Sequence, residues 1–375
     1  MMKKTILSII MSRKTLQINI MRQEFKKLRN VTVLAILLVA CFPGVFAQVN
    51  AGDSRAEIKE KVPGIFEGRE VFDITLKFDV TEFMRKKSDE DYLDAEIIFH
   101  YSESDSASYD IKLRARGERR REICRFPPIR LNFKDTKTIF GDIDSMKNVK
   151  MVTHCNMAKV YDEYVMKEFL IYKMYNYITD YSFRVRLFRV NYVDTGRRGR
   201  NYQKYGFLIE PLDLLEKRLN VFEIENVPLK YDDMVPDILD RMTIFQFMIG
   251  NPDWQVASYH NIKVVKGREQ LKGVPVAYDF DYSGMVNTSY ALPAEVLEIE
   301  NVRQRVHLGA CRDDTTYARI LGEFMDNREN FYKTIDNCIY LDENSKNYMI
   351  KYLDSFYDLY KKDRIISMLK MTCVN

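Results

Sequence analysis

The chain has 375 residues, a formal net charge of +4 at pH 7 and 13% aromatic residues. The positive charge is concentrated at the start, because residues 1–47 hold eight Lys or Arg and one Glu. The remaining 328 residues carry 50 basic and 53 acidic side chains, a formal charge of −3. A chain this close to neutrality has no general electrostatic attraction for nucleic acid, and nucleic acid is not an expected partner. Its length and aromatic content allow a large core and exclude a disordered chain.

Residues 21–47 have the organisation of an export signal. Basic residues between Arg22 and Arg29 precede a short apolar run at 31–40, and Pro43-Gly44 follows it. Ala47 then ends a small-residue cleavage site before Gln48. The apolar run is too short to cross a membrane, so we expect no transmembrane span in the mature chain. We predict that residues 1–47 form the signal-peptide region and that translation starts at Met21 within it. The mature protein is expected in the periplasm, at the cell surface or outside the cell.

Cys41 offers an alternative end to this leader. Residues 38–41 read Leu-Val-Ala-Cys, which resembles a bacterial lipoprotein box. Lipidation of Cys41 is therefore the alternative to cleavage after Ala47.

Five cysteines follow the predicted cleavage site: Cys124, Cys155, Cys311, Cys338 and Cys373. Export favours disulfides, and no C-x-x-C pair supports a zinc site. We predict a first bridge between Cys124 and Cys155, because each adjoins a predicted strand in the same half of the chain. Cys311 with Cys338 is the second predicted pair, which leaves one thiol over.

The first half of the chain, after a polar lead-in at 48–68, is predicted to be mainly β. Alternation of apolar and polar residues predicts short, antiparallel strands. These strands are expected at 71–79, 95–101, 109–116, 129–133 and 149–152. A helical period then predicts one helix at 160–178, and alternation returns in a hairpin formed by 183–193 and 205–210.

The second half is predicted to be mainly α. A helix at 234–249 stops at Gly250, two short strands follow at 262–265 and 274–278, and helices occupy about 314–369. We therefore predict an α+β protein with a mainly β N-lobe at 69–210 and a mainly α C-lobe at 211–375. A site between two such lobes would be a natural cleft.

Oxygen-bearing side chains stand at the ends of apolar segments in the second half. Asp253, Asn261, Asp279 and Asp281 converge from a loop and a following strand. Such oxygens suit a hard divalent cation such as Mg²⁺, which is usually shared with phosphates. The alternative is that they are ordinary turn residues. For His260, in the same loop, we expect a packed structural role; the alternative is a hydrogen bond to a carboxylate.

The first half supplies candidate partners for a phosphate. Arg116, Gly117 and Arg119 belong to a basic turn between two predicted strands, where glycine allows close approach and arginine suits phosphate oxygens. The alternative is a solvated hairpin tip. Glu168 lies in an apolar, aromatic helix, and Lys150 on a neighbouring strand is its candidate partner, unless Glu168 is only a polar position on the solvated face.

Glu210 ends the strand before Pro211. It is expected either to line the connection between the halves or to be a charge at a helix N-terminus.

The order of these motifs resembles the spore coat protein H (CotH-type) family of atypical secreted kinases. The likeness covers roughly residues 111–291. It rests on R-G-E-R-R, Y-G-F-L-I-E, G-N-P-D-W…H-N and V-A-Y-D-F-D-Y-S-G. The resemblance implies a diverged, two-lobed protein-kinase-like fold that uses Mg²⁺ and ATP.

The resemblance also implies roles for individual residues. Asp253 would be the catalytic-loop aspartate, Asn261 and Asp279 would hold Mg²⁺, and Asp281 is a further possible ligand. Arg116 and Gly117 would cover the phosphates.

The chain departs from the family pattern in two places. Phe126-Pro-Pro-Ile-Arg130 stands where the family tends to place lysines, so Lys150 is the candidate ATP-positioning lysine. Asp253 and Asn261 are farther apart than in ordinary kinases, so the loop between them must bulge.

Two functions of different classes are therefore expected. The first is Mg²⁺-dependent transfer of a phosphoryl or nucleotidyl group from a nucleotide to an exported protein or envelope acceptor. The alternative is a catalytically silent, kinase-like binding or structural protein of the cell envelope.

Overall fold

The computed structural model describes residues 64–68, 71–102, 104–196 and 199–374, all of which belong to one compact unit, Glu60–Asn375. The predicted signal peptide, the start at Met21, Cys41 and the cleavage site before Gln48 lie outside the described residues. The end of the predicted lead-in is packed, since Ile65 and Phe66 are buried with the core of the first half.

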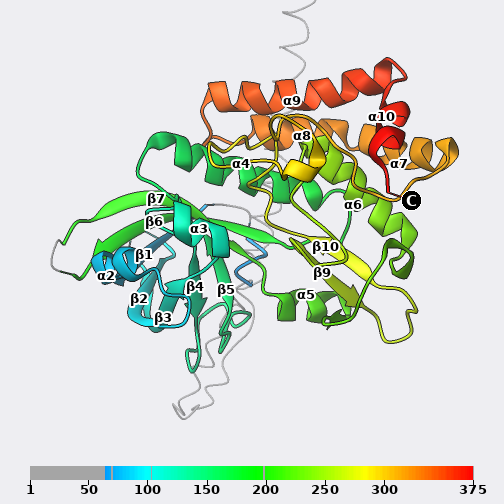
Figure 1. Cartoon of the computed structure of the whole chain (residues 1–375). Helices are drawn as coiled ribbons and strands as arrows, with labels where there is room; N and C mark the ends of the chain where they lie inside the picture. The colour runs from blue at the N-terminus through cyan, green and yellow to red at the C-terminus, as the bar shows by residue number, and fades with distance from the viewer. Residues whose placement is uncertain (1–63, 69–70, 103, 197–198, 375) are drawn as a thin grey trace, which may run out of the picture. The chain divides into compact units, whose positions relative to one another are not determined.

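Seven strands of the first half close into a barrel (Figure 1). In the order in which they pair, they are β1 (Phe72–Phe78), β2 (Leu93–His100), β3 (Ser106–Ala115), β4 (Ile129–Asn132), β5 (Val149–Val152), β7 (Tyr202–Ile209) and β6 (Val185–Asp194). The predicted alternation is clear in β2, where Ala95, Ile97 and Phe99 are buried and their neighbours are not. The strands predicted for the first half are therefore present, and the chain is an α+β protein.

The closure of the barrel was not predicted. Strands β1 to β5 pair antiparallel in chain order, β5 pairs antiparallel with β7, and β7 with β6. Strand β1 also pairs in parallel with β6, with Phe72 opposite Phe188. This pairing joins segments more than a hundred residues apart, so no local pattern reveals it.

The described residues of the first half form three helices where one was predicted. The predicted one is α4 (Lys159–Tyr175), and the additional ones are α2 (Val80–Lys86) and α3 (Glu118–Ile123). Both additional helices are too short to show a helical period. Gly117, with φ of 84°, is the N-cap of α3, so the predicted basic turn is in fact a turn into a helix.

The second half begins with a small sheet and a buried helix. Its elements are α5 (Leu212–Leu219), β8 (Phe222–Ile224), α6 (Pro236–Ile249), β9 (Ile262–Lys266) and β10 (Val274–Ala277). Helix α6 starts with a proline and ends at Gly250, whose φ of 64° is the left-handed conformation that glycine adopts readily. Strand β9 lies between β8 and β10, antiparallel to both. Asp253 follows α6, and Asp279 follows β10.

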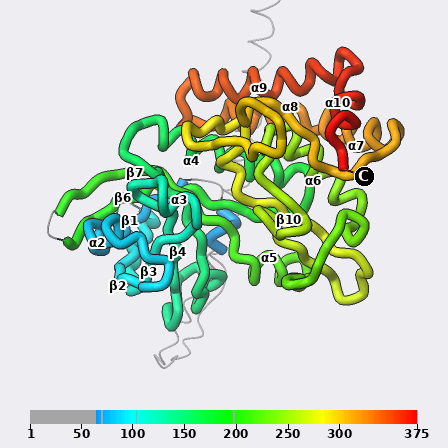
Figure 2. Tube along the Cα trace, in the orientation of Figure 1, coloured from blue at the N-terminus to red at the C-terminus, as the bar shows by residue number. Residues whose placement is uncertain are grey.

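Four helices complete the chain: α7 (Asp314–Asp326), α8 (Arg328–Asp336), α9 (Glu343–Lys361) and α10 (Ile365–Thr372). Asp313 and Asp342 cap α7 and α9 by accepting a backbone N–H three residues on. Figure 2 follows the chain from the barrel through α4, back into β6 and β7, and then into these helices. None of the described helices is long and apolar enough to cross a membrane.

Two hydrophobic clusters fill the fold, one inside the barrel and one around α4, α6 and the C-terminal helices. Strand β7 contributes to both, because Leu208 faces the barrel core while Phe207 and Ile209 face the helical cluster. The predicted division of the chain at 210/211 stays a prediction.

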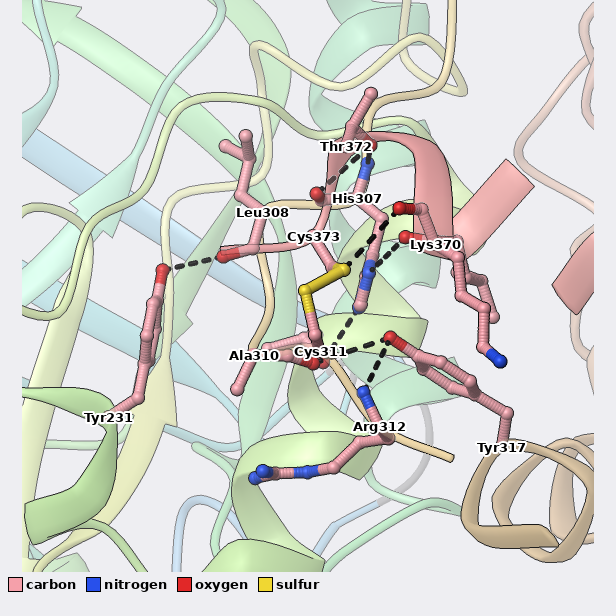
Figure 3. The surroundings of a disulfide bond; sticks show 12 residues. Tyr231, His307, Leu308, Ala310, Cys311, Arg312, Tyr317, Lys370, Thr372 and Cys373 are labelled. Carbon is pink, nitrogen blue, oxygen red and sulfur yellow. Dashed lines mark hydrogen bonds between the residues drawn. A yellow bond between two sulfur atoms is a disulfide. The ribbon is translucent and has the colours of Figure 1, made fainter. Parts of the chain in front are cut away.

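Two disulfides join distant segments. The predicted Cys124–Cys155 bridge is present, with Cα atoms 4.6 Å apart. The second prediction was wrong, because Cys311 pairs with Cys373 and Cys338 is a buried free thiol. Figure 3 shows why: Thr372 hydrogen-bonds both the N–H and the C=O of His307, which brings Cys373 beside Cys311. Two disulfides are consistent with an oxidising compartment outside the cytoplasm.

Candidate functional site

A cavity of about 590 Å³ lies between the start of α3 and the loops that follow α6 and β10. The predicted residues Arg116, Gly117, Arg119, Asp253, Asn261, Asp279 and Asp281 all line it. Arg120, Pro128, His260 and three tyrosines, Tyr259, Tyr278 and Tyr282, also line it. Glu118, Glu122 and Ser258 complete the lining, and Glu122 pairs with Arg119 at 3.3 Å. Two segments that are far apart in the sequence therefore meet here: one carries three arginines and two glutamates, and the other carries the aspartates and Asn261.

Asp253 is held by its own loop. His260 Nε2 lies 2.8 Å from Asp253 Oδ1, and Asn261 Nδ2 donates to Asp253 Oδ2 at 2.9 Å. Between these residues the chain folds back on itself, and Gln255 forms an isolated antiparallel bridge with His260. Asn261 has φ of 52°, so the chain leaves the loop in a left-handed conformation. The carboxylate of Asp253 is thus aimed by two side chains from the same loop.

The expected structural role for His260 was wrong. Its side chain is 55% exposed and lines the cavity. The alternative expectation, a hydrogen bond from His260 to a carboxylate, is confirmed by its contact with Asp253.

Asp279 presents an open carboxylate to the cavity. Its backbone N–H donates to the Tyr172 hydroxyl at 2.8 Å, and its φ of 65° is left-handed. Among the described residues, its carboxylate has no hydrogen-bond or ion-pair partner. A side chain with free oxygens on a constrained backbone is suited to receive a ligand.

Arg120 forms the floor of the cavity and bridges two buried carboxylates. Its Nη1 lies 3.9 Å from Glu168 Oε2, its Nε lies 3.7 Å from Asp281 Oδ2, and its Nη2 donates to the Thr153 carbonyl. Asp281 also accepts a hydrogen bond from Tyr290 at 3.0 Å. The predicted partner of Glu168 was therefore wrong, since Glu168 contacts Arg120 and not Lys150.

Burial shifts the pKa values of this floor. Burial, followed by the charge of Asp279, raises the pKa of Asp281 to about 7. Burial and the charge of Asp281 raise the pKa of Glu168 well above its ordinary value. The charge of the Arg120 guanidinium opposes both rises in pKa. The three charged groups therefore stabilise one another at the bottom of the cavity.

Lys150 lies on β5 with its amine 4.4 Å from the ring centroid of Tyr278, a cation–π contact. Burial and the nearby charges of Arg116 and Lys263 lower its pKa to about 7. It stands behind Tyr278, beside the lining of the cavity.

Glu210 lies outside the lining of the cavity. Its buried carboxylate accepts hydrogen bonds from Arg184 and Arg218, which occupy both oxygens. The geometry gives it a structural role at the junction of β7 and α5.

No protein-family model and no curated protein matches this chain.

Sequence reasoning missed Arg120, the most connected residue of the site. It is one of four arginines in a six-residue stretch, and only the turn at Gly117 and the short helix α3 bury it. The single available signal was the density of arginine itself.

The donor set fits Mg²⁺ in a limited way. No group of three His, Cys, Asp or Glu placed to hold a metal ion occurs in the part of the chain that the structure describes. Asp279 has free oxygens, and Asn261 uses its amide nitrogen on Asp253, which leaves its oxygen to coordinate. Mg²⁺ usually takes one or two protein carboxylates and completes its shell with water and phosphate, so two protein ligands suffice.

Proposed function

We propose that this protein transfers a phosphoryl or nucleotidyl group from a nucleotide to an exported or surface acceptor, in a diverged, two-lobed kinase-like fold of the CotH type. The observation that carries the proposal is the single cavity in which Arg116 and Arg119 meet Asp253, Asn261 and Asp279. Its volume of about 590 Å³ is in the range of small-ligand sites.

The residues of the cavity divide into three roles. Arg116, Arg119 and the backbone at Gly117 bind phosphate oxygens from the barrel side. Asp279 and Asn261 would hold Mg²⁺, which when bound neutralises the phosphate charge. Asp253, fixed by His260 and Asn261, orients the acceptor hydroxyl and accepts its proton.

The arrangement of charges around α4 supports the kinase-like fold within this proposal. In protein kinases a cation and a helix glutamate pair beside the phosphates, and an Asp after a strand holds the metal. Here Glu168 on α4 pairs with Arg120 at the cavity floor, and Asp279 follows β10. The disulfides agree with an acceptor outside the cytoplasm.

A binding module without turnover is the second candidate, and a specific observation favours it. Asp281 is engaged by Arg120 and Tyr290, so it is less available as a second metal ligand. Lys150 stands behind Tyr278 and does not reach the cavity lining. Such a site could hold a nucleotide without completing transfer.

Calorimetric titration with ATP and Mg²⁺, paired with a labelled-phosphate transfer assay, tests the proposal. Asp279→Asn keeps the side-chain shape but removes ligand charge, so Mg²⁺-dependent ATP binding should fall. Asp253→Asn should spare binding and lower turnover by roughly 10²–10⁴. Asp326→Asn, an exposed change on α7, is the matched control.

The outcomes separate the candidates. Binding without transfer in the wild type supports the binding module. Absence of any ATP binding in the wild type overturns both the transfer function and the nucleotide-binding module.

A further inference from the structure

Tyr172 on α4 contacts both the backbone of Asp279 and the side chain of the residue that follows it. The Tyr172 hydroxyl accepts a hydrogen bond from the Asp279 N–H at 2.8 Å. Its ring packs edge-on against Phe280, with ring centroids 4.7 Å apart, and both rings are fully buried. The two contacts fix the turn after β10 to a helix that lies more than a hundred residues earlier in the chain.

The hydrogen bond from Asp279 supports a backbone conformation that a residue with a side chain adopts only at a cost. Asp279 has φ of 65°, in the left-handed region, where Cβ crowds the backbone. The bond to Tyr172 is the only hydrogen bond that Asp279 makes with the described residues. Without the hydroxyl, this partly buried N–H would lose its acceptor, so Tyr172 stabilises the left-handed turn relative to other conformations.

The second proposed cation ligand, Asn261, is tied to the same turn by a separate hydrogen bond. The Tyr278 N–H donates to the Asn261 carbonyl at 3.0 Å, which holds the two loops together. The Asn261 side chain is held as well, because its Nδ2 donates to Asp253. The position of Asn261 therefore depends on its neighbours in the second half of the chain, whereas the Asp279 backbone also depends on α4.

A magnesium site is sensitive to such positioning. Mg²⁺ demands a nearly ideal octahedron of oxygens at about 2.1 Å, so a ligand that shifts or rotates loses much of its contribution. Asp279 is the only one of the two proposed ligands that carries a charge. The direction of its carboxylate therefore has a large share in the affinity for the cation.

We propose that Tyr172 is a positioning residue for the divalent cation: its hydroxyl holds the Asp279 backbone so that the carboxylate is directed to the site shared with Asn261. This inference rests on the proposed function and adds to it the residue that orders the cation ligand. Glu168, four residues before Tyr172 and on the same face of α4, contacts Arg120 at the floor of the cavity. One helix therefore positions both the cation ligand and the floor.

Tyr172→Phe tests the hydroxyl, because it keeps the ring that packs against Phe280. Mn²⁺ is a paramagnetic cation that accepts the same oxygen ligands as Mg²⁺, and its binding with and without ATP is measured by electron paramagnetic resonance. We expect the variant to bind Mn²⁺ at least fivefold more weakly than the wild type. Hydrogen exchange at the Asp279 amide, measured by NMR without any cation, should become at least tenfold faster.

A double-mutant cycle separates positioning from a general loss of structure. If Tyr172 acts through the Asp279 carboxylate, Tyr172→Phe should change the residual Mn²⁺ affinity of Asp279→Asn by less than about twofold. An equal fivefold loss in both backgrounds would contradict action through Asp279.

Tyr192→Phe is the matched control. It removes a buried tyrosine hydroxyl in the barrel that has no hydrogen-bond partner among the described residues. This variant should bind Mn²⁺ within about twofold of the wild type, and a loss as large as that of Tyr172→Phe would contradict the inference.

The failure of this inference is distinct from the failure of the proposed function. If the wild type binds Mn²⁺ and ATP while folded Tyr172→Phe keeps its Mn²⁺ affinity, only the inference is overturned. If the wild type binds Mn²⁺ but not ATP, a fivefold loss in Tyr172→Phe still supports the inference, and the nucleotide function is overturned. No Mn²⁺ binding by the wild type, with or without ATP, overturns the cation site and the inference with it.

Discussion

Glu210 and Asp279 are two acidic residues that each follow a strand, yet their surroundings are opposite. Both oxygens of Glu210 accept hydrogen bonds from Arg184 and Arg218, and its side chain is fully buried. The carboxylate of Asp279 lines a cavity and has no such partner among the residues described. Position relative to a strand therefore does not separate a structural carboxylate from one that can bind a ligand. What separates the two residues is whether hydrogen-bond donors already occupy both carboxylate oxygens. Each prediction below changes one of these two residues or its surroundings.

The largest effect is expected from removing the Cys124–Cys155 disulfide, which holds α3, the helix whose start lines the same cavity as Asp279. This bridge ties the end of α3 to the segment after β5, and α3 carries Arg120. Cys124→Ser/Cys155→Ser should lower the free energy of unfolding by about 4 kcal/mol, from the entropy of the 31-residue loop. It should also weaken ATP binding by the folded protein, because Arg120 loses its anchor.

The Cys311–Cys373 bridge provides the matched control for that experiment. Cys311→Ser/Cys373→Ser should cost a similar free energy of unfolding, measured by denaturant titration, while ATP binding by the folded fraction stays near wild type. Equal loss of binding in both double variants would contradict a specific role for the α3 anchor.

The second prediction tests Glu210, the carboxylate whose oxygens both accept hydrogen bonds within the protein. Glu210→Gln leaves Arg184 and Arg218 without their carboxylate, and it should lower the free energy of unfolding by about 3 kcal/mol. Urea unfolding followed by fluorescence measures it, with Asp326→Asn as the exposed control. A loss below about 1 kcal/mol would show that the saturated carboxylate is not a structural anchor.

Lys150→Met should stabilise the protein at pH 7 by about 1–3 kcal/mol. The pKa of Lys150 is lowered to about 7, so between that pH and its ordinary value of 10.5 the unfolded chain binds a proton that the folded protein does not. Stability of the wild type therefore rises with pH across this window. The gain of the variant should shrink over the same window, and a gain that is independent of pH would refute the explanation.

The smallest effect on stability is expected at Asp279. Asp279→Asn should change the free energy of unfolding by less than about 0.5 kcal/mol, because no partner among the described residues is lost. Thermal unfolding without ligand measures it. A large loss of stability would mean that the carboxylate oxygens of Asp279 are occupied within the protein, as those of Glu210 are.

The local pattern of the sequence determined most of the regular elements and much of the site. Alternation at Ala95, Ile97 and Phe99 predicted β2, and Gly250 predicted the end of α6, because a period of two and a left-handed stop are properties of a few neighbouring residues. The grouping of Asp253, Asn261 and Asp279 was also local, since all three lie at the ends of apolar segments. These three residues line one cavity.

Only the tertiary structure decided which distant residues meet. The parallel pairing of β1 with β6, the partner of Cys311, and the choice of Arg120 over Lys150 for Glu168 all depend on contacts across the fold. Helix α3 adds to this, because six residues show no period, yet its turn at Gly117 buries one arginine of four. The physical reason is that a periodic pattern reports the face that a residue presents, whereas its partner is set by packing between elements that are far apart in the chain.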